Sequence, residues 1–293
     1  MGYAMSVPAS FYRHFAVERE SFQCCDTTFE IAVSGIRATE AARRARETAS
    51  GLEAQLDAFD PGSAVSRLNQ TGRVENEHVA AIVERGLEYI ERTDGRFDVR
   101  HGAVEHTLKA YLRGDTDEFD AAFGDGDGHV FVDGDTVRAS VRLDLNGLAK
   151  GYIVDRATDA LGGVGRRGYV NGGGDMTPAT GPVAIESPYG DQKPLRIVET
   201  NWAIASSGNY NRYRGNADHI YEPRTGRIGA RSDLVTVLAR RDCMEADALA
   251  TTLATMHHED AIDFATRWPG VEAFLVHDGV FHQTEGFSNH VYT

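Results

Sequence analysis

The chain has 293 residues, 41% of them hydrophobic, and a formal net charge of −14 from 44 acidic and 30 basic side chains. This length can bury a large core, while no stretch approaches the roughly 20 apolar residues of a membrane-spanning helix. The acidic balance argues against general nucleic-acid binding. We see no secretory segment and therefore expect a cytoplasmic protein.

The first half of the chain predicts alternating strands and helices. Residues 1–20 are interpreted as an N-terminal extension to a single domain that covers residues 1–293. The elements expected next are a strand at 22–34, a charged amphipathic helix at 39–58, a turn-rich segment at 59–72 and a helix at 76–93.

Later segments add strands, two helices and a hairpin. The dipeptide Asp133-Gly134 joins two short strands and is a strong hairpin signal. The pair His257-His258 is interpreted as a helix end and not as a metal site. Further elements are strands at 168–175, 183–187, 195–205, 233–239, 272–276 and 279–283, a loop with hairpin character at 206–230, and helices at 244–256 and 259–267.

One lysine stands where an ordinary helix would not need it. In "LDLNGLAKGYIVDRA", Asn146 can cap a helix that starts near Gly147, so Lys150 falls near the positive end of the helix dipole. The chain has only three lysines, and Gly147 and Gly151 flank this one. Backbone N–H groups, the dipole and a lysine would together suit a phosphate. A surface lysine beside a tight packing contact is the alternative.

The segment "MEADALATTLATM" (244–256) places two oxygen donors on one helix face. Asp247 and Thr251 are spaced i, i+4, at the edge of an apolar stripe. A carboxylate beside a hydroxyl suits a hard cation. Equally, Asp247 can favour the helix dipole in the first turn and Thr251 can bond to a backbone carbonyl.

A polar segment presents a possible base. His219 precedes Glu222 in a region dense in turn residues, and histidine can titrate near neutrality. A lone histidine of this kind is more often structural. The run "VNGGGDM" sets three glycines after a strand, where the backbone turns sharply or approaches a ligand.

Taken together, these segments resemble one family over nearly the whole chain. The matching blocks, in order, are "FDPGSAVSRLN", "GRFDVRHGAV", "LDLNGLAKGYIVDRA", "VNGGGDM", "ASSGNYNRY", "HIYEPRTGR" and "EADALATTL". They resemble the magnesium-dependent FAD:protein FMN transferases. Enzymes of this family split FAD, release AMP and attach FMN through its phosphate to a threonine or serine of a target protein.

The resemblance implies a fold and a set of site residues. The fold would be α+β, with mixed or antiparallel sheets packed with helices, in two intimately joined halves with the nucleotide in the cleft between them. His219 would deprotonate the acceptor hydroxyl, and Lys150 would contact the flavin nucleotide. Asp144 would bind the adenosine side of FAD, Tyr221 would contribute through its backbone, and the remaining FAD site would be lined by Arg96, Phe97 and Asp98. Mg²⁺ would be held by the Gly147 carbonyl, Asp247 and Thr251, with Ala250 close by.

The chain also departs from the family pattern. Glu222 stands where the family usually has aspartate, and Cys25-Asp26-Thr27 stands where it usually has Met-Gly-Thr. The family's lipoprotein signal is absent. The change near Cys25 weakens the expectation that the family's flavin contacts occur there. The missing signal weakens the expectation that the protein is exported.

Two other functions use the same residues. In an FAD pyrophosphatase, water would replace the protein hydroxyl, so that only the products distinguish the two enzymes. A non-catalytic flavin-binding protein would retain intact FAD and release no AMP. The partners expected for the transferase are FAD and an acceptor protein with a Thr/Ser flavinylation motif.

Overall fold

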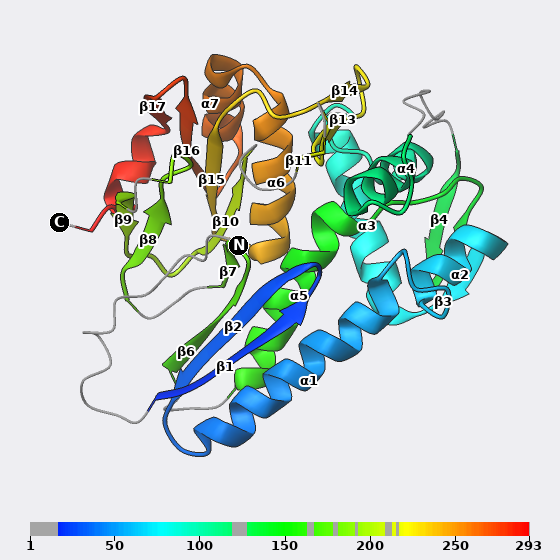
Figure 1. Cartoon of the computed structure of the whole chain (residues 1–293), viewed down its shortest axis with the longest axis horizontal. Helices are drawn as coiled ribbons and strands as arrows, with labels where there is room; N and C mark the ends of the chain where they lie inside the picture. The colour runs from blue at the N-terminus through cyan, green and yellow to red at the C-terminus, as the bar shows by residue number, and fades with distance from the viewer. Residues whose placement is uncertain are drawn as a thin grey trace. The chain divides into compact units, whose positions relative to one another are not determined.

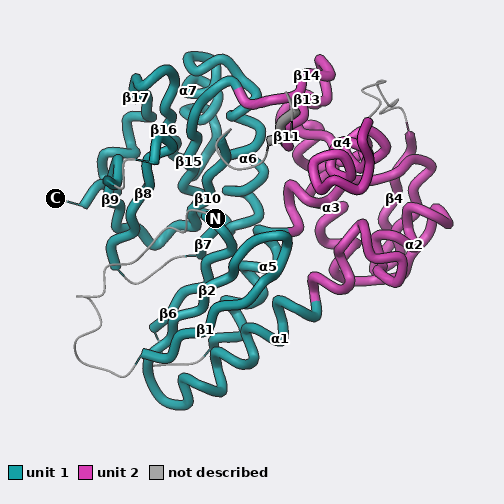
Figure 2. The backbone as a smooth tube through the Cα atoms, in the orientation of Figure 1, with its two compact units in different colours: residues 1–51, 150–211, 231–293 teal, residues 52–149, 212–230 magenta. Residues whose placement is uncertain are grey.

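A computed structural model describes residues 17–118, 128–162, 167–177, 181–190, 193–208, 213–214 and 217–292. The chain folds into two compact units, drawn in teal and magenta in Figure 2. Unit 1 is made of residues 1–51, 150–211 and 231–293, and unit 2 of residues 52–149 and 212–230. Each unit therefore combines segments that are far apart in the sequence.

Unit 1 contains an eight-stranded sheet in which every neighbouring pair of strands is antiparallel (Figure 1). Strands β8 (Val183–Glu186) and β9 (Pro194–Val198) form a separate antiparallel pair. In order across the large sheet, the strands are β1 (Val17–Cys24), β2 (Thr27–Ser34), β6 (Arg167–Gly172), β7 (Asp175–Met176), β10 (Ala203–Ser207), β15 (Leu234–Ala239), β16 (Val271–His277) and β17 (Val280–Gln283).

The first strand pair corrects the expected start of the fold. Residues 22–34, predicted as one strand, belong to two strands that form a hairpin, with Cys24 paired to Thr27. The two loop residues, Cys25 and Asp26, have positive φ angles of 55° and 56°. Two such residues match a type I′ turn, which usually contains glycine or asparagine. Residues 17–20, assigned to an N-terminal extension, are part of β1, and residues 1–16 lie outside the described residues.

Helix α6 (Cys243–Thr255) packs on β10 and β15 (Figure 1). All of its residues are buried except Thr251, which is half-buried. Strand β15 is buried along its whole length, as expected for a strand covered on both faces. The other helices with residues in unit 1 are α1 (Ala38–Leu56), α5 (Asn146–Leu161), α7 (His258–Arg267) and the 3₁₀ helix η3 (Glu285–His290).

Unit 2 combines helices with short antiparallel strands. Its three-stranded sheet has the order β3 (Arg73–Glu75), β5 (Thr136–Ala139), β4 (Val130–Asp133), so the predicted hairpin at Asp133-Gly134 is confirmed. The helices are α2 (Ala64–Thr71), α3 (Glu77–Arg92), η2 (Val99–His101) and α4 (Gly102–Arg113). Two further strand pairs are β11 (Tyr213–Arg214) with β12 (Ala217–Asp218), and β13 (Tyr221–Glu222) with β14 (Arg227–Ile228).

Helix α2 corrects the segment predicted to be only turns. Its N-cap is Ser63, whose hydroxyl accepts a hydrogen bond from the Ser66 N–H at 2.9 Å. Its C-cap is Gly72, in the left-handed conformation. The turn residues at 60–63 therefore start a helix instead of replacing one.

The fold is mixed α and β with antiparallel sheets, as predicted. No described helix combines the length and the apolar character needed to cross a bilayer.

Candidate functional site

Lys150 lies between two carboxylates of unit 1. It is the fifth residue of α5, and its Nζ donates to Asp175 Oδ2 and lies 3.4 Å from Asp247 Oδ1. Burial alone would lower the pKa of this ammonium, but the two carboxylates outweigh it and raise the pKa above its usual value. Lys150 is therefore a permanent cation. Its carboxylate partners, which local sequence spacing did not reveal, explain how the helix tolerates it.

Asp175 is the most enclosed member of this cluster. Its side chain has 0% exposure, and its Oδ1 is buried with no hydrogen-bond partner among the described residues. Burial and the neighbouring Asp247 charge raise the pKa of Asp175, while Lys150 opposes the rise. A buried carboxylate oxygen in a folded protein is normally satisfied by a donor, a water or an ion. Asp175 thus adds an oxygen donor beside Asp247.

The two predicted metal ligands on α6 contact different neighbours. Asp247 Oδ2 accepts a hydrogen bond from the Gly151 N–H at 3.2 Å, and Thr251 Oγ1 lies 3.3 Å from Ser207 Oγ on β10. Ala250, expected close to the metal, is fully buried. Asp175, Asp247 and Thr251 offer oxygen atoms, the donors that Mg²⁺ prefers. The residues present therefore fit this ion.

Close backbone contact positions α6 against α5. A Cβ atom on Gly151 would stand 2.6 Å from the Cys243 carbonyl oxygen, which is too close for any other residue. Asp155 accepts hydrogen bonds from the N–H groups of Cys243 and Met244 at 3.0 and 3.1 Å. Burial raises the pKa of Asp155 to about 7. Gly151 thus allows the approach of the two helices, and Asp155 caps the helix that carries Asp247.

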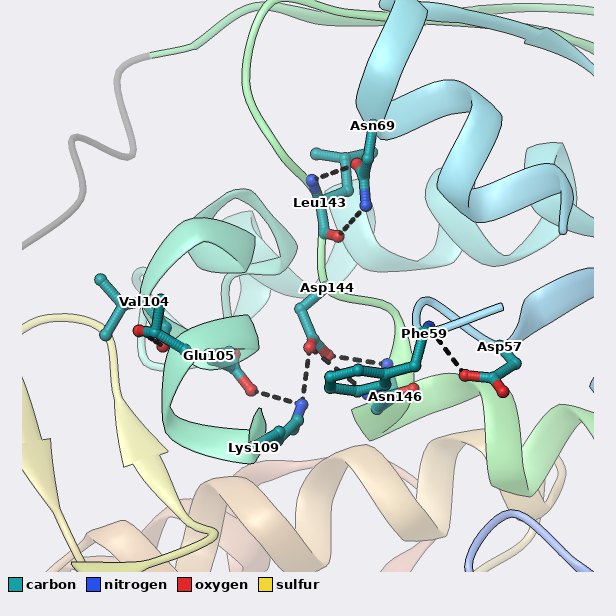
Figure 3. Close-up of polar contacts among 10 residues, drawn as sticks. Asp57, Phe59, Asn69, Val104, Glu105, Lys109, Leu143, Asp144 and Asn146 are labelled. Atoms are coloured by element: carbon teal, nitrogen blue, oxygen red, sulfur yellow. Dashed lines mark hydrogen bonds and ion pairs between the residues drawn. The ribbon is translucent and has the colours of Figure 1, made fainter. Parts of the chain in front are cut away.

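In unit 2, Lys109 lies between Asp144 and Glu105, as Figure 3 shows. Its Nζ is 2.6 Å from Asp144 Oδ2 and 2.9 Å from Glu105 Oε2. Asp144 Oδ1 also accepts a hydrogen bond from the Asn146 N–H at 2.9 Å, at the first residue of α5. Burial and the Asp144 charge raise the pKa of Glu105 to about 7. Asp144, predicted to bind FAD, is thus also part of a protein ion network.

The extended segment before α5 is held by a side-chain amide. Asn69 donates to the Leu143 carbonyl at 2.9 Å and accepts from the Leu143 N–H at 2.8 Å (Figure 3). This pairing imitates a strand ladder. It fixes the residue that directly precedes Asp144.

Arg96 and Asp98 form ion pairs within unit 2. Arg96 Nη1 lies 3.1 Å from Glu222 Oε1, and Thr225 donates to the other oxygen of Glu222 at 2.7 Å. Glu222, which stands where the family usually has aspartate, is therefore a buried carboxylate that holds Arg96. Asp98 caps η2 by accepting from the Arg100 N–H at 2.9 Å.

Phe97 and Tyr221 are the aromatic members of the predicted site. A Cβ on Gly147 would stand 2.9 Å from the Phe97 ring, so this glycine allows the ring to lie against the start of α5. Tyr221 is 6% exposed, and its hydroxyl is buried without a hydrogen-bond partner in the described part of the chain. His219, two residues earlier, is half-buried. The predicted residues thus form two groups. Lys150, Asp247, Ala250 and Thr251 are in unit 1, and the others are in unit 2.

Comparison with known proteins assigns the family. A sequence model of the ApbE family matches residues 25–275. The chain belongs to the ApbE family. It is 30% identical over 234 residues to the FAD:protein FMN transferase of Vibrio cholerae, which covers 70% of each chain, and 29% identical to that of Chlamydia muridarum, over 71% of this chain and 74% of the relative.

Solved structures of ApbE proteins share this fold. The ApbE protein of Thermotoga maritima superposes with a TM-score of 0.82 at 24% identity, over 95% of this chain and 100% of the other. The flavin transferase ApbE from Vibrio cholerae gives 0.77 at 23% identity, over 94% and 99%. The family assignment makes the chain an enzyme of the transferase class.

Sequence reasoning missed three charged residues of this ApbE protein. Asp175 is the next-to-last residue of "VNGGGDM", a run in which only the glycines give a local signal. Lys109 and Glu105 are spaced i, i+4 on α4, and this spacing was the available signal. Their third partner, Asp144, is 35 residues away from Lys109 and could not be paired with it from local spacing.

Proposed function

We propose that the chain is a Mg²⁺-dependent FAD:protein FMN transferase that acts on a threonine or serine of an acceptor protein and releases AMP. Family membership and the names of the relatives support FAD as the substrate. The observation that carries the proposal is the Lys150–Asp175–Asp247 cluster, in which a half-buried cation lies beside two buried carboxylates that can serve a hard cation as oxygen donors. A pyrophosphate complexed with Mg²⁺ needs both.

The reaction transfers the FMN moiety through its phosphorus. The acceptor hydroxyl oxygen attacks the phosphorus of the FMN half, the bond from that phosphorus to the bridging oxygen breaks, and AMP leaves with that oxygen. His219 takes the hydroxyl proton. Lys150 stabilises the negative charge that develops on the phosphate oxygens.

The remaining residues have binding roles in this proposal. The metal ligands would be the Gly147 carbonyl, Asp247 and Thr251, beside Ala250. When bound, Mg²⁺ supplies charge neutralisation at the pyrophosphate. Flavin and adenosine recognition would fall to Arg96, Phe97, Asp98, Asp144 and the backbone of Tyr221.

The test is product analysis. The chain is incubated with FAD, Mg²⁺ and a protein that carries a Thr/Ser flavinylation motif, and the acceptor is then weighed by mass spectrometry while AMP is quantified. We expect the acceptor to gain the mass of FMN less one water, with one AMP released per acceptor modified. Free FMN and AMP with an unmodified acceptor would indicate a pyrophosphatase. Stoichiometric intact FAD without AMP would indicate a flavin-binding protein.

A further inference from the structure

Four of the eleven histidines of the chain gather at one place in unit 1. The ring of His258 lies 4.3 Å from that of His257, 4.6 Å from that of His277 and 4.4 Å from that of His282, measured between centroids. None of these residues belongs to the site described above. We call them the histidine cluster.

Three elements bring the cluster together. His257 is the N-cap of α7 without a side-chain capping bond, and His258 is the first residue of that helix. His277 ends β16 and His282 lies on β17, the next strand of the sheet, and α7 packs against both strands. The pair His257-His258 lies at the N-terminal end of α7, in agreement with the predicted helix end, whereas the sequence predicted no metal site here. His277 and His282, on the β16–β17 hairpin, lie beside this helix end and complete the cluster.

The central histidine has an unsatisfied nitrogen. His258 Nδ1 is buried and has no hydrogen-bond partner among the residues that the structure describes. Desolvation and the neighbouring histidines His257, His282 and His277 lower the pKa of His258. A buried imidazole nitrogen without a hydrogen-bond partner among the described residues is available to a metal ion.

The neighbouring His277 is oriented as metal-binding histidines usually are. Its Nδ1 lies 2.9 Å from the Arg231 carbonyl oxygen, which can only accept a hydrogen bond, so Nδ1 carries the proton. The lone pair is then on Nε2, which is 3.7 Å from the exposed Asp278 carboxylate. A ligating histidine whose other nitrogen donates to a backbone carbonyl is a recurring feature of metal sites.

We propose that the histidine cluster binds one divalent transition-metal ion of the class that prefers imidazole, such as Zn²⁺, Ni²⁺ or Cu²⁺. Imidazole nitrogens suit these ions, whereas Mg²⁺ prefers oxygen, so this site is chemically distinct from the one on α6. The rings of His258 and His277 are stacked in the structure, and the other ring pairs of the cluster are tilted. Binding therefore requires side-chain rotation that brings ring nitrogens to about 2.0–2.1 Å from the ion. The side chain of His257 is exposed.

The test is calorimetric titration of the untagged, metal-free chain with Zn²⁺ in excess Mg²⁺. We expect one Zn²⁺ per chain at the histidine cluster, measured in a Cys25→Ser background because Cys24, Cys25 and Glu53 form another possible metal group. His257→Ala, His277→Ala and His282→Ala should each weaken the affinity at least about tenfold. His129→Ala and His290→Ala, which remove histidines outside the cluster, should not change it. Asp247→Ala should also bind Zn²⁺ normally, because it affects only the proposed Mg²⁺ site.

A second measurement tests the ligand type. Cu²⁺ bound to the wild-type chain should show nitrogen hyperfine splitting in its electron paramagnetic resonance spectrum, and the splitting should be reduced in His257→Ala, whose exposed side chain is not needed for folding. The proposal is overturned if the wild-type chain binds no Zn²⁺, or if the three cluster variants bind it as tightly as wild type. In either case the cluster would be only a stack of imidazole rings.

Discussion

Two of the three lysines of the chain have the same kind of surroundings, one in each unit. Lys109 in unit 2 and Lys150 in unit 1 each lie between two carboxylates. In the first network both oxygens of Asp144 are bonded, to Lys109 and to the Asn146 N–H. In the second, the Oδ1 of Asp175 is buried and has no partner within the described residues.

The bonding of the Asp144 and Asp175 oxygens distinguishes a network that holds the chain from a network that can bind a ligand. A closed network of ions and donors mainly fixes the chain, here the segment that leads into α5. A buried carboxylate oxygen without a donor has a free energy cost that a cation relieves. The Lys150 cluster is therefore the better candidate for a ligand, although both networks use the same residue types.

The largest effect should come from removing the α6 carboxylate. Asp247→Asn should lower Mg²⁺-dependent AMP release more than about 100-fold, because loss of a direct ligand should exceed the 10–100-fold cost of losing an outer-shell partner. The matched control is Glu105→Gln, a carboxylate of the Lys109 network, which should keep most of the activity. Full activity of Asp247→Asn at limiting Mg²⁺ would contradict the metal assignment.

The proposed base, His219, belongs to neither lysine network, so its loss should leave both intact. His219→Ala should bind FAD and Mg²⁺ normally and transfer FMN about 10²–10⁴-fold more slowly, the usual contribution of a general base. Transfer to the acceptor and AMP release are measured together. Continued AMP release without transfer would show that water reaches the phosphate. Unchanged transfer at every pH would remove His219 from the mechanism.

Replacing each lysine compares the two networks directly. Lys150→Met and Lys109→Met should each lower the free energy of unfolding by about 3–5 kcal/mol, because removal of one partner leaves buried carboxylates unpaired. Mg²⁺ should restore part of the loss only in Lys150→Met, where a cation can neutralise Asp175 and Asp247. Urea unfolding with and without Mg²⁺ measures this. Equal recovery in both variants would remove the distinction between the networks.

The smallest effect concerns pH. The pKa of Glu105 is raised from its ordinary value of 4.5 to about 7, so the folded state holds this proton more tightly than the unfolded state. Its contribution to stability is complete below pH 4.5 and is lost as pH rises to about 7. Glu105→Gln should remove a decline on the order of 1–3 kcal/mol across this window. The free energy of unfolding is measured against pH by urea unfolding. If Glu105→Gln showed the same decline as wild type, this prediction would be contradicted. The part of the decline that comes from Asp155 should remain in the variant.

Local signals predicted several elements correctly. The glycine of Asp133-Gly134 predicted its hairpin, whereas the turn at Cys25 and Asp26 adopts positive φ angles without a glycine and was read as continuous strand. Helix α2 was missed because Asp60, Pro61 and Gly62 predict a turn, and the capping role of Ser63 was not recognised.

Local spacing predicted members of the candidate site only where they are close in sequence, and the family resemblance supplied the rest. The i, i+4 spacing of Asp247 and Thr251 identified them as possible ligands. The partners of Lys150 are 25 and 97 residues away, on β7 and α6, so only the paired strands and packed helices bring them together. For the same reason the histidine cluster was visible in the sequence only as His257-His258.

The strand order of unit 1 brings distant parts of the sequence to the proposed metal site. β10 pairs with β7 on one side and with β15 on the other. β15 follows the last segment of unit 2 in the sequence. A nascent chain that stops before residue 240 contains Lys150 and Asp175 but neither Asp247 nor Thr251. Such a chain lacks the two α6 side chains that are proposed to bind the metal. The proposed metal site therefore depends on residues that follow unit 2 in the sequence, although its lysine and Asp175 precede the last segment of that unit.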